Sequence, residues 1–198
     1  MLRKYVLALS IAALPVAAVA ASTATANASV RPHKAVTFTG SVSCALAGAI
    51  KATPAITDTP SKSTIAIKLS GKLTKCTGNV TQGGLTISKG TVSSTATLPA
   101  GTTCTSLLSS LPKPIGKISW TPTVTGGNTI KPTAFALSSP KLASESPITI
   151  DYTSTQTGSF AGKGAAKAVV KQGIATLLND CGGAGVTTLT LTTGSTVS

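Results

Sequence analysis

The amino-acid sequence predicts an all-β protein: an immunoglobulin-like antiparallel β-sandwich of about seven to nine strands, with one or two short helices and two disulfides. Three observations predict it. Apolar residues alternate with Thr, Ser and Ala over long stretches, which is typical of strands that bury one face. Glycines and prolines separate these runs roughly every ten residues, as in sandwiches and barrels. Short strands, loop-linked cysteines and the single, central Trp120 favour the sandwich over the barrel.

The alternation is clearest over residues 36–50, where the apolar side chains occupy the even positions. Residues 52–63 contain two prolines and are expected to form a loop. A second strand is predicted over residues 65–73, with Lys68 and Lys72 on the face opposite its apolar residues. Residues 77–84 are expected to form a turn.

The apolar positions then change parity. Leu85 and Ile87 are odd, whereas Val92 and Leu98 are even. Because a slip of one residue turns the buried face of a strand to the other side, Lys89-Gly90 is expected to mark a bulge or a hairpin turn.

The rest of the chain predicts short strands with two helical segments between them. The leucines of residues 105–111 have helical spacing, and residues 174–180 have helical character. Trp120 is interpreted as a core residue, with a ligand-stacking role on a sheet face as the alternative. The remaining strands are expected at residues 118–124, 134–137, 148–152, 160–170 and 186–192.

The four cysteines are expected to form two disulfides, since an even number in an exported chain is typical of a disulfide framework. Three pairings are possible, and we favour Cys44–Cys76 with Cys104–Cys181. The first bond would join two strands that are consecutive in sequence. The second would tie the C-terminal third of the chain to its middle.

Several short segments carry a resemblance to a known family. They are Cys44-Ala45-Leu46-Ala47-Gly48, Leu69-Ser70-Gly71-Lys72-Leu73-Thr74-Lys75-Cys76, Ile118-Ser119-Trp120 and Asn179-Asp180-Cys181. On these the chain resembles exported, uncharacterised proteins of high-GC Gram-positive bacteria with an immunoglobulin-like β-sandwich. The resemblance supports the strand order and the cysteine pairing. It transfers no catalytic residue, because the family has no established activity.

Residues 1–28 have the pattern of a cleavable secretory signal, with Arg3 and Lys4 followed by an apolar run and small residues. The run is shorter than the roughly 20 residues that span a bilayer. Cleavage is expected after Ala28, with Ala20 as the alternative. We therefore predict a single domain over residues 29–198, secreted and either extracellular or associated with the cell wall, with no membrane span in the mature chain.

The net charge of the full sequence is +13, and loss of Arg3 and Lys4 with the signal leaves +11. Such a charge attracts polyanions, and we consider Lys68, Lys72 and Lys75 candidate contacts for an anionic cell-envelope polymer. Solubility alone is the alternative explanation. A specific nucleic-acid module is not expected, because few aromatic residues are available for base stacking.

The sequence contains few residues that could act in catalysis. The only histidine, His33, lies in a polar segment, and no serine stands in a nucleophile elbow. The cysteine spacing matches no zinc pattern, and no cofactor motif is present. We therefore expect a non-enzymatic protein, without a cofactor, that binds an extracellular or cell-envelope partner. The alternative is a secreted hydrolase that uses a carboxylate pair such as Glu145 and Asp151.

Overall fold

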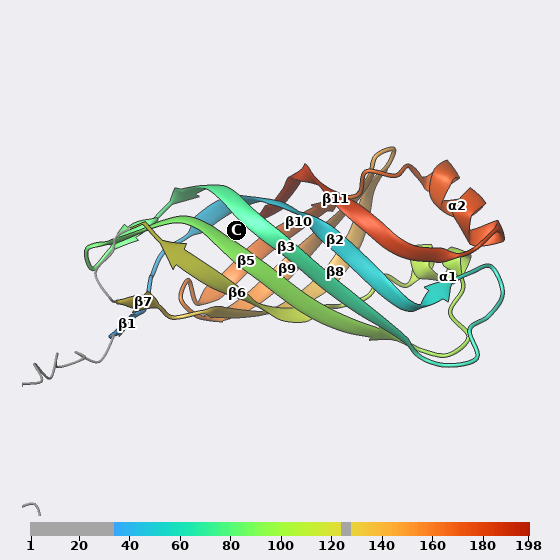
Figure 1. The fold of residues 1–198 in the computed structure, drawn as a ribbon, viewed down its shortest axis with the longest axis horizontal. Helices are drawn as coiled ribbons and strands as arrows, with labels where there is room; N and C mark the ends of the chain where they lie inside the picture. The colour runs from blue at the N-terminus through green and yellow to red at the C-terminus, as the bar shows by residue number, and fades with distance from the viewer. Residues whose placement is uncertain (1–33, 124–127) are drawn as a thin grey trace, which may run out of the picture. The chain divides into compact units, whose positions relative to one another are not determined.

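A computed structural model describes residues 34–123 and 128–198 of the chain. Eight long strands form an antiparallel sheet in which each strand pairs with the next along the chain. The last strand pairs with the first, so the sheet closes into an eight-stranded barrel (Figure 1). The barrel strands are β2 (Val42–Ile56), β3 (Ile65–Gly78), β5 (Leu85–Leu98), β6 (Ile115–Pro122), β8 (Thr133–Glu145), β9 (Ile148–Gly158), β10 (Gly162–Val169) and β11 (Val186–Val197).

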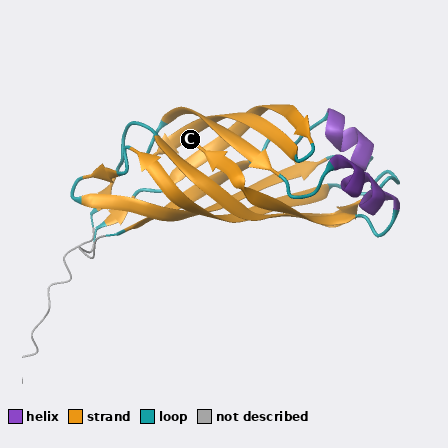
Figure 2. Ribbon diagram, turned by 90° about the horizontal axis from the view of Figure 1, so that it is seen from above, coloured by secondary structure: helices purple, strands orange, loops and turns teal. Residues whose placement is uncertain are grey.

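The smaller elements lie around the two ends of the barrel. The helices α1 (Cys104–Ser109) and α2 (Ile174–Gly182) gather at one end (Figure 2). The two-residue strands β1 (Ala35–Val36) and β7 (Thr129–Ile130) pair in parallel, and β4 (Thr81–Gln82) forms a hairpin with β5. The signal segment 1–28, His33 and Val124 lie outside the described residues.

The predicted immunoglobulin-like sandwich is therefore wrong, although the all-β class is right. A sandwich needs two sheets with separate edges, whereas here β3 pairs with both β2 and β5, and β11 pairs with β2. The Cys44–Cys76 bond joins β2 and β3, two neighbouring strands of the same sheet, instead of two facing sheets. β3 is longer than expected, with 14 residues that run from Ile65 to Gly78. β2 has the 15 residues expected of the first strand, but it covers Val42–Ile56 and not residues 36–50.

The predictions for individual helices and strands agree with the structure better than the predicted fold does. Both predicted helices are present. The change of parity in β5 is a bulge, because the register against β6 shifts between Ile87 and Lys89. The predicted loop over residues 52–63 is wrong at its start, since β2 continues to Ile56. Pro54 is tolerated there because the β2–β11 register shifts between Thr188 and Val186, which interrupts the ladder at this point.

Trp120 is a core residue at the end of the barrel opposite the helices. Its ring packs edge-on against Phe160, with 5.3 Å between centroids, and Phe38 lies 5.7 Å from Phe160. The Trp120 Nε1–H donates to the Thr133 hydroxyl at 2.9 Å, and that hydroxyl donates to the Ser159 carbonyl at 2.6 Å. The aromatic cluster is thereby fixed to the backbone at the end of β9.

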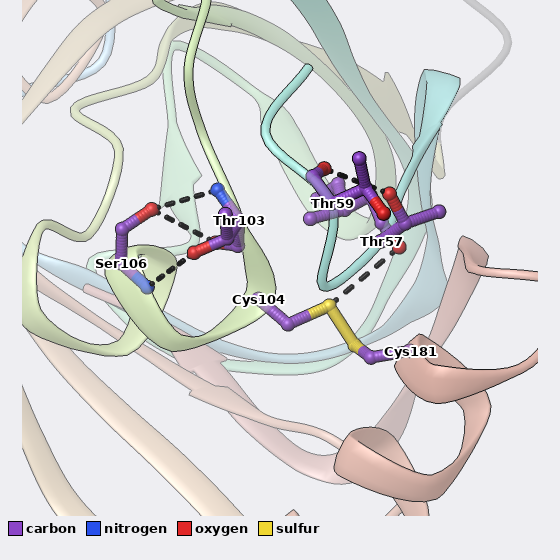
Figure 3. Close-up of a disulfide and its surroundings, with 7 residues drawn as sticks. Thr57, Thr59, Thr103, Cys104, Ser106 and Cys181 are labelled. Atoms are coloured by element: carbon purple, nitrogen blue, oxygen red, sulfur yellow. Dashed lines mark hydrogen bonds between the residues drawn. A yellow bond between two sulfur atoms is a disulfide. The ribbon is translucent and has the colours of Figure 1, made fainter.

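Both predicted disulfides are confirmed. Cys44–Cys76 lies within the barrel wall, and Cys104–Cys181 joins α1 to α2 (Figure 3). The loops they close, 32 and 77 residues long, correspond to roughly 3.7 and 4.5 kcal/mol in the chain-entropy treatment. Two disulfides indicate an oxidising environment outside the cytoplasm.

The Thr133→Val substitution keeps the side-chain shape but removes the hydroxyl between Trp120 and Ser159. Thr133 is fully buried, so both partners lose their hydrogen bond without gaining water. We expect a loss of roughly 1–3 kcal/mol for each orphaned group, measured by denaturant unfolding with Trp120 fluorescence. The exposed Thr155→Val variant on β9 is the control and should change stability by less than about 0.5 kcal/mol. Equal effects of the two substitutions would contradict this assignment.

Candidate ligand cavity inside the barrel

The interior of the barrel contains a cavity of about 130 Å³. Its lining is almost entirely apolar and draws on every barrel strand. One lining residue from each strand, in chain order from β2 to β11, is Leu46, Leu69, Val92, Ile118, Phe135, Ile150, Ala168 and Leu191. The cavity is thus a property of the whole barrel, because inward positions of all eight strands form its wall.

The space exists because several inward positions carry small side chains. An eight-stranded barrel has an interior just wide enough for side chains to fill it or for one small ligand. Ala96 on β5 and Ala166 and Ala168 on β10 face the cavity where larger residues would fill it. Gly116 makes room for Phe135, whose Cζ lies 2.8 Å from the position that a Cβ would take.

The inward face of β9 departs from the apolar pattern. Its consecutive inward residues Tyr152, Ser154 and Gln156 are all buried and polar, and all three line the cavity. The Gln156 amide donates to the Ser154 hydroxyl at 3.1 Å and to the Ser198 carbonyl at 3.0 Å. Burial raises the pKa of the Tyr152 hydroxyl from 10 to about 12, because the phenolate would lose its hydration. The polar strip of β9 therefore stays uncharged at neutral pH.

The helical end of the barrel is covered by α1 and the segment that follows it. Leu107, Leu111 and Pro114 reach the cavity wall, and the Pro114 carbonyl accepts a hydrogen bond from the β8 backbone at Leu137. Packing and hydrogen bonds therefore hold this cover against the barrel.

The start of α1 is fixed by polar contacts around the disulfide. Thr103 and Ser106 form a reciprocal capping box, shown in Figure 3. The Cys104 N–H donates to the Thr57 carbonyl at 3.1 Å, and the Asp58 N–H donates to the Cys181 carbonyl at 3.4 Å. Access from this end therefore requires movement of a cross-linked cap.

The three lysines singled out from the sequence lie outside the cavity. Lys68 and Lys72 are exposed on the outer face of β3. Lys75 is exposed in a bulge of β3, with a backbone φ of 51°. The structure adds Lys51 of β2, which lies directly opposite Lys68 and was not singled out. Together Lys51, Lys68 and Lys72 form a group that we call the basic face.

The four carboxylates do not form a catalytic pair at the cavity. Asp151 pairs across the sheet with Lys141 and Lys167, whereas Glu145 is exposed at the end of β8. Asp58 and Asp180 lie near α2 and are exposed. None of these four residues lines the cavity. Two carboxylates flanking one substrate, as glycoside hydrolysis requires, are not found at this site.

One group of potential metal ligands occurs in the described residues, namely Asp58, Cys104 and Cys181, whose ligand atoms lie within 4.8 Å of one another. Metal binding requires cysteine thiolates. Both sulfurs are held in a disulfide, so these residues do not fit a metal ion.

Two features of the sequence are signs of the cavity, although the alternation of apolar and polar residues did not predict it. Ala166 and Ala168 alternate on a strand where larger apolar residues would be usual for a filled core. Tyr152, Ser154 and Gln156 are polar residues at alternate positions, and such a pattern alone predicts the solvent-facing side of a strand. The structure shows that this side of β9 is buried. The burial of that row depends on the pairing of β9 with β8 and β10.

No family model, curated protein or solved structure matches the chain. No helix in the described part of the chain is long and apolar enough to span a membrane.

The raised pKa of Tyr152 predicts a stability change at high pH. Below pH 10 the hydroxyl is protonated in both the folded and unfolded states, and stability is unaffected. Between pH 10 and about 12 the unfolded state ionises first, so the free energy of unfolding falls by roughly 3 kcal/mol across this range.

The Tyr152→Phe variant should lack this component, and lysine deprotonation affects both proteins alike. The measurement is the difference in unfolding free energy between wild type and variant from pH 9 to 12. A constant difference across that range would contradict burial of the hydroxyl. Tyr152 is the only tyrosine in residues 29–198, so tyrosinate absorbance reports its ionisation directly.

Proposed function

We propose that this protein is a secreted, non-enzymatic binding protein that holds a small apolar molecule inside its barrel. The single observation that carries the proposal is the apolar cavity of about 130 Å³ at the centre of the fold. A packed domain normally leaves few voids larger than a water molecule. A void of this size therefore lowers stability, and a ligand that fills it restores the lost contacts.

The size and lining indicate a compact ligand. An engineered apolar cavity of about 150 Å³, lined by Leu, Ile and Phe, stays dry and binds benzene or xenon. The present cavity is close to that volume and has the same kind of lining. The expected ligand is thus a ring-sized molecule or a slim chain of similar volume.

The lining supports binding over catalysis. Its hydroxyl groups belong to Ser94, Tyr152 and Ser154 together with threonines of β5 and β11, and no histidine or carboxylate among the lining residues can activate them. The only charged residue at the wall, Lys167, has an exposed side chain. The alternative of a carboxylate-pair hydrolase gains no support from the positions of Glu145 and Asp151.

Secretion forms part of the proposal. Its support is the signal pattern of residues 1–28 together with two disulfides that need an oxidising compartment. Secretion of the processed chain into the medium or the wall fraction, with Ser29 as its first residue, is the expected finding.

Filling the cavity should abolish binding of a small apolar probe. Toluene at ten times its dissociation constant should stabilise the wild type by about 1.4 kcal/mol in thermal or chemical unfolding. The Ala168→Leu and Ala96→Leu variants place a larger side chain in the cavity and should lose this stabilisation.

The control for cavity filling is Ala165→Leu, which makes the same change at an exposed position of β10. It should bind toluene as the wild type does. If toluene stabilises neither the wild type nor the control, the proposed function is wrong.

A second candidate function rests on the basic face. Lys51 and Lys68 lie directly opposite each other on neighbouring strands, and Lys72 follows on the same side of β3. Like charges directly opposite are destabilising, and an anionic polymer laid across the two strands would remove the repulsion. This agrees with the high positive charge of the chain and with an envelope polymer as partner.

Replacing Lys51, Lys68 and Lys72 by Gln should weaken binding of heparin, used as a soluble polyanion, by about tenfold or more at low salt. The control replaces Lys89, Lys131 and Lys163, which are also exposed, and makes the same charge change. Titrations over a salt series measure both. Equal weakening in the two triple variants would show a diffuse charge effect and remove the basic face as a site.

A further inference from the structure

The cavity contains a polar group that the protein leaves without a partner. Ser94 on β5 is only 4 % exposed, and its hydroxyl has no hydrogen-bond partner within the described residues. Ser94 is one of the residues that line the cavity. Its hydroxyl oxygen is covered by neighbouring atoms, so it meets a ligand once its side chain turns about the Cα–Cβ bond. Burial of an unpaired hydroxyl is unfavourable, and buried polar groups are nearly always paired. The unpaired hydroxyl of Ser94 therefore indicates a partner that is not part of the protein.

The neighbouring strands do not supply that partner. At the level of Ser94, β3 presents Leu69 and β6 presents Gly116, neither of which has a polar side chain. The same level continues through Phe135 of β8 to Gln156 of β9. The Gln156 amide nitrogen is already engaged with Ser154 and the Ser198 carbonyl. A molecule bound in the cavity would supply the partner that these side chains do not.

A second residue with a hydroxyl group lines the cavity. Tyr152 lines it, and no other described residue forms a hydrogen bond with the Tyr152 hydroxyl. Hydroxyl groups both donate and accept, so Ser94 and Tyr152 suit an alcohol, a phenol or a carbonyl oxygen. The rest of the wall is apolar and suits a hydrocarbon body.

We propose that the ligand of the cavity is an uncharged molecule with a compact apolar body and one hydrogen-bonding oxygen, and that this oxygen pairs with the Ser94 hydroxyl. The inference rests on the proposed function and specifies its ligand class. A charged group does not suit the lining, because the only charged lining residue, Lys167, has an exposed side chain and a buried ion without a counter-ion is strongly unfavourable. The apolar body takes up the ring-sized space between the strands, and the oxygen selects among ligands of equal size.

The experiment compares phenol, toluene and benzoate, which share a ring and differ in one substituent. Calorimetric titrations at pH 7 give their affinities for the wild type and for Ser94→Ala. The variant should lower the ratio of phenol to toluene affinity by about two- to tenfold, the equivalent of one net hydrogen bond. Toluene affinity should stay the same or rise, and benzoate should bind neither protein measurably.

The matched control is Ser93→Ala, which removes an exposed hydroxyl one residue away on the outer face of β5. It should leave the phenol to toluene ratio unchanged. The Ser94→Ala protein should unfold at the same denaturant concentration as the wild type or a higher one, because an orphaned hydroxyl has been removed.

The outcomes separate this inference from the function on which it rests. If toluene binds but Ser94→Ala leaves the ratio unchanged, the inference is overturned, as it would be if a buried water already satisfied Ser94. Benzoate binding as tight as that of phenol would overturn the uncharged class. If neither toluene nor phenol binds the wild type, cavity binding itself is wrong.

Discussion

Closure of the sheet is the constraint on which the rest of this structure depends. When β11 pairs with β2, every long strand of the main sheet has a paired neighbour on both sides, and the sheet has no edge strand. Closure also sets the width of the interior, because strand number and tilt determine the diameter of a barrel. The strands of a closed barrel cannot move closer together when the inward side chains are too small to fill the interior. The size of the inward residues therefore decides whether the interior is solid or hollow.

The interior of this barrel is solid at one end and hollow in the middle. At the solid end, the buried rings of Phe38, Trp120 and Phe160 pack against one another. Further along, alanines such as Ala166 and Ala168 leave the walls apart. The cover over the helical end is cross-linked by Cys104–Cys181. The fold thus combines an aromatic cluster at one end, a cavity in the middle and disulfide-linked helices at the other end. This arrangement is expected of a protein that holds a ligand inside its barrel.

The helices, most of the strands and the number of disulfides could be predicted from sequence, because each depends on local pattern or on counting. The pairing of the cysteines was a choice among three possibilities. The β5 bulge followed from the parity change between Ile87 and Val92. Closure could not be predicted, since period-two alternation is the same in a sandwich and in a barrel. It depends on the pairing of β2 with β11, which are far apart in the chain. The cavity shares this limit, because inward residues such as Ser94 and Gln156 come from different strands, and their common level depends on strand registers that the alternation does not specify.

The polar residues of the interior also bear on how the cavity should be understood. An unselected void in a core would be expected to have apolar walls, because every buried hydroxyl without a partner lowers stability. Here Tyr152, Ser154 and Gln156 occupy successive inward positions of one strand, with Ser94 on the opposite side of Phe135. Departures from local packing rules concentrate at functional sites. A void and an unpaired hydroxyl are each costly alone, and a single ligand with an apolar body and one oxygen removes both costs together.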